Sequence, residues 1–155
     1  MNEDLMARLQ AGGYSCVVRQ GDRVYTFTQR GVADLYDLYT RRPELLRGAD
    51  VADKVVGRGA AALMVLGGVR SLHAGVVSAP ARELLAAAGV DVTAGRVVPF
   101  IINRAGTGRC PLETATEGLT RPEDLWPVIR DFVARLRSGD APAAAAAAPA
   151  PSSLS

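Results

Sequence analysis

The sequence predicts one α/β domain, a three-layer α/β/α sandwich in which helices cover both faces of a mixed β-sheet. Three observations favour this class. A helix and a hairpin come first along the chain, and strands then alternate with helices. Apolar residues make up 48% of the chain, as is typical of globular domains. The 155 residues are enough for a sizeable core.

Each element is predicted from hydrophobic spacing and from the residues that end it. Residues 3–11 form a short helix that ends at two glycines. Segments 14–19 and 23–28 flank a Gln-Gly-Asp turn and form an antiparallel hairpin. Residues 51–66 carry the strongest helical pattern, with apolar or small residues at three- and four-residue intervals. Further helices are predicted at 31–39, 80–88, from 110 and at 121–137, and strands or apolar runs at 69–78, 90–93 and 97–102.

Composition separates a folding unit from a tail. Residues 1–138 contain all of the predicted elements, whereas residues 139–155 are almost entirely Ala, Pro and Ser. The tail has an alanine run between prolines that is too short for a persistent helix in water. We therefore predict a folded domain at 1–138 and a disordered, dispensable tail at 139–155.

Charge and apolar patterning exclude several classes of partner. The net charge is only +2, and the 17 arginines are scattered rather than gathered in a basic stripe, which argues against nucleic-acid binding. The longest apolar stretch, 60–69, is too short to cross a bilayer, and the first ten residues do not resemble a signal peptide. Two cysteines give no disulfide framework. We expect a cytoplasmic protein without a membrane partner, and homo-oligomerisation is left open.

Three segments resemble a known family of bacterial proteins. They read VADKVVGRGAAALMVLGGV at 51–69, VVSAPARELLAAAGV at 76–90 and VPFIINRAGTGRCPLE at 98–113. On these segments the chain resembles domain-of-unknown-function family 1893, which is grouped with the cytidine-deaminase-like superfamily, over about residues 3–137. The resemblance implies a cytidine-deaminase-like fold and brings no assigned reaction.

The zinc motifs of that superfamily are missing. Its zinc lies between two helix starts, one with H-x-E or C-x-E and one with P-C-x-x-C. The resemblance aligns these motifs with positions 52–54 and 78–81, which contain neither histidine nor cysteine. Elsewhere, Cys16 is predicted to be a small buried hydrophobe and His73 a core or edge residue of a strand. We therefore expect no metal, no other cofactor and no deaminase activity.

Cys110 is the predicted reactive thiol. It stands where a helix N-cap would lie, with Pro111 at the first helical position, and a helix start favours the thiolate. Arg104 and Arg109 add positive charge, which Glu113 opposes. The alternative is a turn that only happens to place a small residue before a helix.

The turn before Cys110 is a candidate ligand contact. Its glycines, Gly106 and Gly108, can present backbone N–H groups to an anion, although the Lys and Ser/Thr of a P-loop are missing. Asn103 and Arg104 precede these glycines and are expected to approach the same ligand. Turn glycines without a ligand role are the alternative.

Lys54 is the sole lysine in a chain that otherwise uses arginine. A lysine can lose its proton when it is desolvated, and an arginine cannot. With Asp53 it is predicted in the first turn of the 51–66 helix, facing a crevice that Ser78 also lines. There Lys54 would bind an anionic group or perform proton or imine chemistry, oriented by Asp53. The alternative is a solvated lysine on the same face as Arg58.

Three functions remain open. The first is a non-zinc enzyme that acts on a small anionic or nucleoside-like ligand through Lys54, Asp53 and Cys110. The second is a ligand-binding or sensory module that uses the same pocket without catalysis. The third is an interaction protein that uses Trp126 and the final helix as its contact surface.

Overall fold

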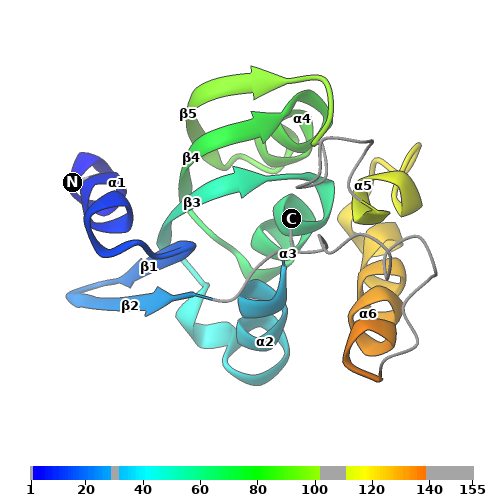
Figure 1. The fold of residues 1–155 in the computed structure, drawn as a ribbon, viewed down its shortest axis with the longest axis horizontal. Coiled ribbons are helices and arrows are strands. Elements are labelled where there is room, and N and C mark those ends of the chain that lie inside the picture. The colour runs from blue at the N-terminus through cyan, green and yellow to red at the C-terminus, as the bar shows by residue number, and fades with distance from the viewer. Residues whose placement is uncertain (1, 29–31, 102–110, 139–155) are drawn as a thin grey trace.

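The computed structural model describes residues 2–28, 32–101 and 111–138 (Figure 1). The strands are β1 (Cys16–Gln20), β2 (Arg23–Phe27), β3 (Asp50–Val56), β4 (Ser71–Ser78) and β5 (Asp91–Val98). The helices are α1 (Asn2–Gly12), α2 (Ala33–Arg41), α3 (Arg58–Gly67), α4 (Ala79–Ala87), α5 (Pro111–Ala115) and α6 (Pro122–Ser138), with a short 3-10 helix at Pro43–Leu45. The predicted tail lies outside the described residues.

The five strands form one mixed sheet in the order β2-β1-β3-β4-β5. β1 pairs antiparallel with β2 and with β3, whereas β3, β4 and β5 are parallel. The predicted hairpin is confirmed, with Cys16 opposite Phe27 and Gln20 opposite Arg23. The α/β class and the mixed sheet are confirmed as well.

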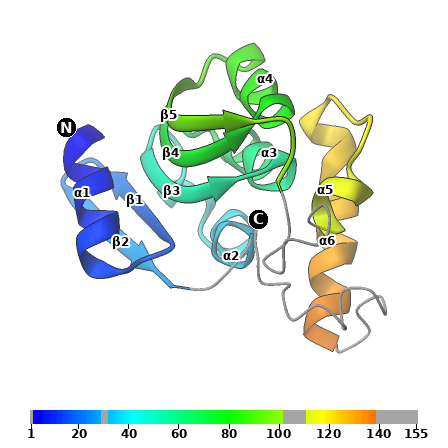
Figure 2. The same cartoon turned by 45° about the horizontal axis from the view of Figure 1, so that its top comes forward.

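Neighbouring residues of the central strands serve two different cores, because side chains alternate along a strand. Val17 and Ala52 pack with Leu5 and Leu9 of α1. The next residues along, such as Val18, belong to the larger core with α2, α3 and α4. Figure 1 shows α1 on one side of the sheet and α3 on the other, with α6 beyond α3 (Figure 2). No described helix has both the length and the apolar character needed to cross a membrane.

The prediction of one helix over 51–66 is wrong. The first half is β3, the middle strand of the sheet, and the helix begins only at Arg58, after the extended Gly57. Five of the seven β3 residues are buried, because the strand is covered on both faces and bonded to β1 and β4. A strand buried on both faces carries no polar alternation, so its valines and alanines matched helical spacing by coincidence.

The C-terminal elements differ less from the prediction. The two apolar runs at 90–93 and 97–102 are largely one strand, β5, at the edge of the sheet. The final helix, predicted at 121–137, is α6, and Leu125, Ile129 and Val133 form its buried stripe. Residues four positions apart lie on the same face of a helix, so the spacing of this stripe indicated the helix correctly.

Candidate functional site

Asp53 and Lys54 do not act together as predicted. Both lie in β3 rather than in a helix turn, so their side chains point to opposite faces of the sheet. Asp53 is buried on the side of α2 and α3, with 8% of its surface exposed. Lys54 is exposed on the side of α1. The expectation that Asp53 orients Lys54 in a shared crevice is therefore corrected.

Ser78 also has a different position from the one predicted. It is fully buried, and its hydroxyl oxygen accepts a hydrogen bond from the Ala81 N–H at 3.2 Å. Ser78 is thus the N-cap of α4, which satisfies one of the free N–H groups at the start of the helix. This local structural role replaces the expected ligand contact.

The other predicted site residues lie outside the described residues. They are Asn103, Arg104, Gly106, Gly108 and Cys110, all within 102–110. α5 begins at the next residue, Pro111, but contains only five residues. A helix this short provides a weak dipole. The predicted reactivity of Cys110 stays a prediction and rests less on a helix dipole than the sequence indicates.

A buried group of acidic side chains lies beside the middle of β3. Asp53 is directly opposite Cys16 across the β1–β3 pair, and Asp34, in the first turn of α2, is 6% exposed. Burial raises the pKa of Asp53 to about 8, with Asp34 adding to the rise. The backbone N–H groups of Val55 and Lys54 offset only part of it; Val55 N lies 3.4 Å from Asp53 Oδ1. Asp53 is therefore a neutral carboxylic acid at pH 7.

Cys16 is the small buried hydrophobe that the sequence predicts. Burial raises the pKa of its thiol well above the ordinary value, and the charges of Asp53 and Asp34 raise it further. A protonated, buried thiol is a poor nucleophile. Cys16 contributes packing to the larger core rather than chemistry.

A second buried pair, Arg58 and Glu113, lies at the start of α3. Arg58 is 8% exposed, donates a hydrogen bond to the Thr116 carbonyl oxygen, and lies 3.8 Å from Glu113 Oε1 through its Nη2. Glu113, in α5, is 3% exposed, and neither of its carboxylate oxygens has a hydrogen-bond partner among the described residues. Such an unsatisfied buried carboxylate is costly, and in native proteins it calls for an explanation.

Asp34, Arg58 and Glu113 lie in the first turns of three helices, and these helix starts meet. A Cβ added to Gly59, in the first turn of α3, would collide with Leu112 of α5 and touch Val32, the N-cap of α2. Only glycine allows so close an approach. Asp34, Arg58 and Glu113 each stand one or two residues from these contacts. We call Asp34, Asp53, Arg58 and Glu113 the polar cluster; Asp53 lies in the middle of β3, and the other three lie in the first turns of α2, α3 and α5.

Sequence reasoning missed three members of this polar cluster. Asp34 lies in the first turn of an amphipathic helix, where an acidic residue is ordinary. Arg58 was placed on a solvated helix face, and Glu113 was noted only as a charge that opposes nearby arginines. The one available signal was Arg58, a single charge in a stretch of apolar and small residues. Among the described residues, no three side chains of the metal-ligating types are grouped to hold an ion, and the expected lack of zinc stays a prediction.

Comparisons with known proteins identify the family. A family model described as "TM1506: Domain of unknown function (DUF1893)" matches residues 4–133. No curated protein matches the chain. The fold is similar to the crystal structure of a DUF1893 family protein (TM1506) from Thermotoga maritima at 2.70 Å resolution, with a TM-score of 0.76 and 23% identity. That match covers 83% of this chain and 87% of the other. This chain therefore belongs to the DUF1893 family.

Proposed function

We propose that this chain is an enzyme that binds a small, polar, nucleoside-like ligand at the polar cluster and transfers a proton through Asp53 and Asp34. The polar cluster consists of two buried pairs, Asp53 with Asp34 and Arg58 with Glu113, and Arg58 follows the carboxyl end of β3 directly. Ligands of open α/β sheets bind outside the carboxyl ends of the strands. The proposal includes a cytidine-deaminase-like, three-layer arrangement and a cytoplasmic location.

The charge balance of the polar cluster carries this proposal. Burial is the largest cause that raises the pKa of Asp53, and an ionised Asp53 would also be a second negative charge beside Asp34 and away from water. Holding a proton on one carboxyl relieves the repulsion, and Asp53 is the group whose pKa is raised to about 8. A general acid works best when its pKa is near the working pH.

The same balance changes the expected ligand. The anionic ligand predicted from the sequence depends on Lys54, which lies on the other face of the sheet, and on the turn at 105–108. Among the described residues of the polar cluster, only Arg58 can attract an anion. We therefore propose that a proton-accepting or cationic nitrogen of the ligand faces Asp53 and Asp34.

A binding module without catalysis is the second candidate, because the unsatisfied oxygens of Glu113 would also suit a ligand that is held but not changed. The contact-surface function of Trp126 has less support. Trp126 packs against Tyr36 and Tyr39 within the molecule. The ring is half-buried, so it does not form a broad exposed surface for a protein partner.

The experiment is a thermal-shift screen of a metabolite pool on the wild-type chain, Asp53→Asn and Lys54→Arg. Compounds that stabilise the wild type and Lys54→Arg but not Asp53→Asn would support the site. Turnover of those compounds, followed by mass spectrometry, would favour the enzyme over the binding module. Equal stabilisation of all three proteins would contradict the proposal.

A further inference from the structure

A hollow of about 570 Å³ lies at the other end of α3 from the polar cluster. α3 has ten residues, which places its two ends roughly 15 Å apart. The hollow lies between α2, α6 and the residues that follow α3, and its size is within the range of small-molecule sites. We call it the aromatic hollow; it is lined by Tyr39, Thr40, Pro43, Arg47, Leu66, Gly67, Gly68 and Trp126.

The wall of the aromatic hollow is held rigid by contacts behind it. Tyr36 stacks on Trp126 with ring centroids 5.7 Å apart, and Tyr39 meets Trp126 edge to face at 5.0 Å. Arg137 fixes Tyr36 from α6: its guanidinium lies 5.7 Å from the ring centroid and forms two hydrogen bonds to Asp37, at 2.9 and 3.0 Å. A wall fixed before binding loses little conformational entropy when a ring packs against it.

The floor of the aromatic hollow lies beside a partial negative charge, whereas its rim carries a positively charged side chain. Gly68 ends α3 with a φ of +82°, a conformation that favours glycine, so the floor has no side chain there. The nearby helix end carries carbonyl groups and a partial negative charge. Arg47 stands at the rim with its side chain exposed. Its acidic neighbour Glu44 forms an ion pair with Arg42 at 2.8 Å, and the charge of Arg47 adds only a smaller contribution to the lowered pKa of Glu44.

We propose that the aromatic hollow binds a small molecule in which a planar aromatic ring carries an anionic group. The ring would pack on Tyr39, Trp126 and the half-buried Leu66. Its positively polarised edge would face the carbonyl groups at the end of α3. The anionic group would then reach Arg47, whose planar guanidinium suits a carboxylate or a phosphate.

The test uses two fluorescent probes that differ in charge, on the full chain. One is the anion 1-anilinonaphthalene-8-sulfonate, and the other is N-phenyl-1-naphthylamine, which has the same rings without the sulfonate. Trp126, the one tryptophan of the chain, reports binding by energy transfer to either probe. We expect one saturable site for the anionic probe and weaker binding of the neutral probe.

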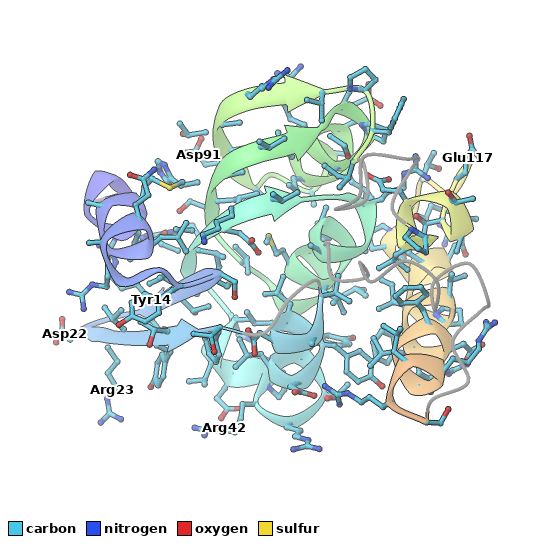
Figure 3. The ribbon with its side chains drawn as sticks, in the orientation of Figure 1. Tyr14, Asp22, Arg23, Arg42, Asp91 and Glu117 are labelled. Atoms are coloured by element: carbon cyan, nitrogen blue, oxygen red, sulfur yellow. The ribbon has the colours of Figure 1, made fainter. Side chains whose placement is uncertain are left out.

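Arg47→Gln should weaken binding of the anionic probe at least about threefold, as expected for one partly exposed charge pair, and leave the neutral probe unchanged. Arg23→Gln is the matched control, because Arg23 is an exposed arginine on the hairpin, on the other side of the molecule from α6 (Figure 3). Unchanged binding in Arg47→Gln, an equal loss in Arg23→Gln, or no saturable site in the wild type would overturn the proposal.

Two pairs of competitors, each a charged compound and an uncharged counterpart, then separate the sources of the anionic group. Displacement of the anionic probe by adenosine monophosphate but not by adenosine assigns the site to a nucleotide phosphate. Displacement by phenylacetate but not by phenylacetamide assigns it to an aromatic carboxylate. Displacement by the uncharged compound as readily as by its charged counterpart would contradict the role of Arg47.

Discussion

Asp50 and Asp53 are the same residue type, three positions apart in β3, and both are buried, yet their surroundings are opposite. Burial by itself would raise the pKa of Asp50, but hydrogen bonds from Arg70, Ser71 and Arg19 outweigh it and hold that pKa well below its usual range. Asp53 has Asp34 and Cys16 as neighbours and a pKa of about 8. The start of the strand therefore holds a paired carboxylate, and its middle holds a proton.

The contacts of Asp50 explain its part in stability. Arg70 donates to both carboxylate oxygens, at 3.1 and 2.7 Å, while Arg19 and Ser71 add hydrogen bonds at 2.8 and 2.6 Å. These bonds link the starts of β3 and β4 to β1. A buried carboxylate satisfied in this way stabilises the fold, whereas the carboxylate oxygens of Glu113 have no hydrogen-bond partner among the described residues, an arrangement that costs stability. Such a cost is typical of functional sites.

The largest expected effect comes from removing the paired carboxylate. Asp50→Ala should lower the free energy of unfolding by about 3 kcal/mol, because Arg19 and Ser71 lose a buried partner. The exposed Arg70 can turn to water and adds little to the loss. Urea unfolding at pH 7 measures this change. A loss below about 1 kcal/mol would mean that Asp50 does not hold the strands together.

Asp53→Asn should change stability in the opposite direction. Because the pKa of Asp53 is higher in the folded chain than in the unfolded chain, the folded state binds the extra proton between about pH 4 and 8. The free energy of unfolding of the wild type must then fall as the pH rises through this range. The neutral Asn removes that dependence, so the variant should gain at least about 1 kcal/mol at pH 8 and little at pH 4.

Urea unfolding at a series of pH values tests this gain, with Lys54→Arg as the matched control from the neighbouring position. The control should keep the pH dependence of the wild type. A variant that is less stable than the wild type at pH 8 would show that Asp53 is held as a stabilising carboxylate.

The stability of the fold at low pH tests the contrast between Asp50 and Asp53 further. The pKa of Asp50 is depressed in the folded chain, so the contribution of Asp50 to stability is complete above the unfolded pKa near 4. That contribution is lost as the pH falls towards the folded pKa. Wild-type stability should therefore drop below pH 4, and Asp50→Ala should flatten that drop. Thermal unfolding between pH 2 and 5 compares the two proteins. An equally steep drop in Asp50→Ala would show that other carboxyl groups cause the loss of stability below pH 4.

The smallest effect concerns the two thiols. Cys16 is buried and protonated, so alkylation of the native chain should label Cys110 first. Peptide mapping after a short exposure to iodoacetamide gives the two rates. Faster labelling of Cys16 would show that the Asp53 surroundings open readily to solvent.

Much of the fold could be predicted because its outer elements carry clear periodicity. The hairpin alternates, and α6 repeats its buried residues every four positions. β3 could not be recognised, because its residues do not alternate between polar and apolar and its small and apolar residues continue into the helical spacing of α3. The predicted helix placed Asp53 and Lys54 together in one helix turn. In β3 their side chains point to opposite faces of the sheet.

The polar cluster was still harder to predict. Asp34, Arg58 and Glu113 come from three helices that are far apart in the chain, and only packing at Gly59 brings their first turns together. Nothing in the local sequence distinguishes a buried charge from an exposed one. Asp53 was found, but for its neighbour Lys54 rather than for the acidic surroundings that set its pKa.

The protonation of Asp53 in the folded chain tests the account most directly. Carbon-13 NMR of aspartate carboxyl carbons, with Asp53→Asn used to assign the signal, gives its titration curve. The account predicts a midpoint several units above that of an exposed aspartate, near pH 8, and a lower midpoint in Asp34→Asn, where one neighbouring charge is removed. A midpoint near 4 in the folded wild type would contradict the account.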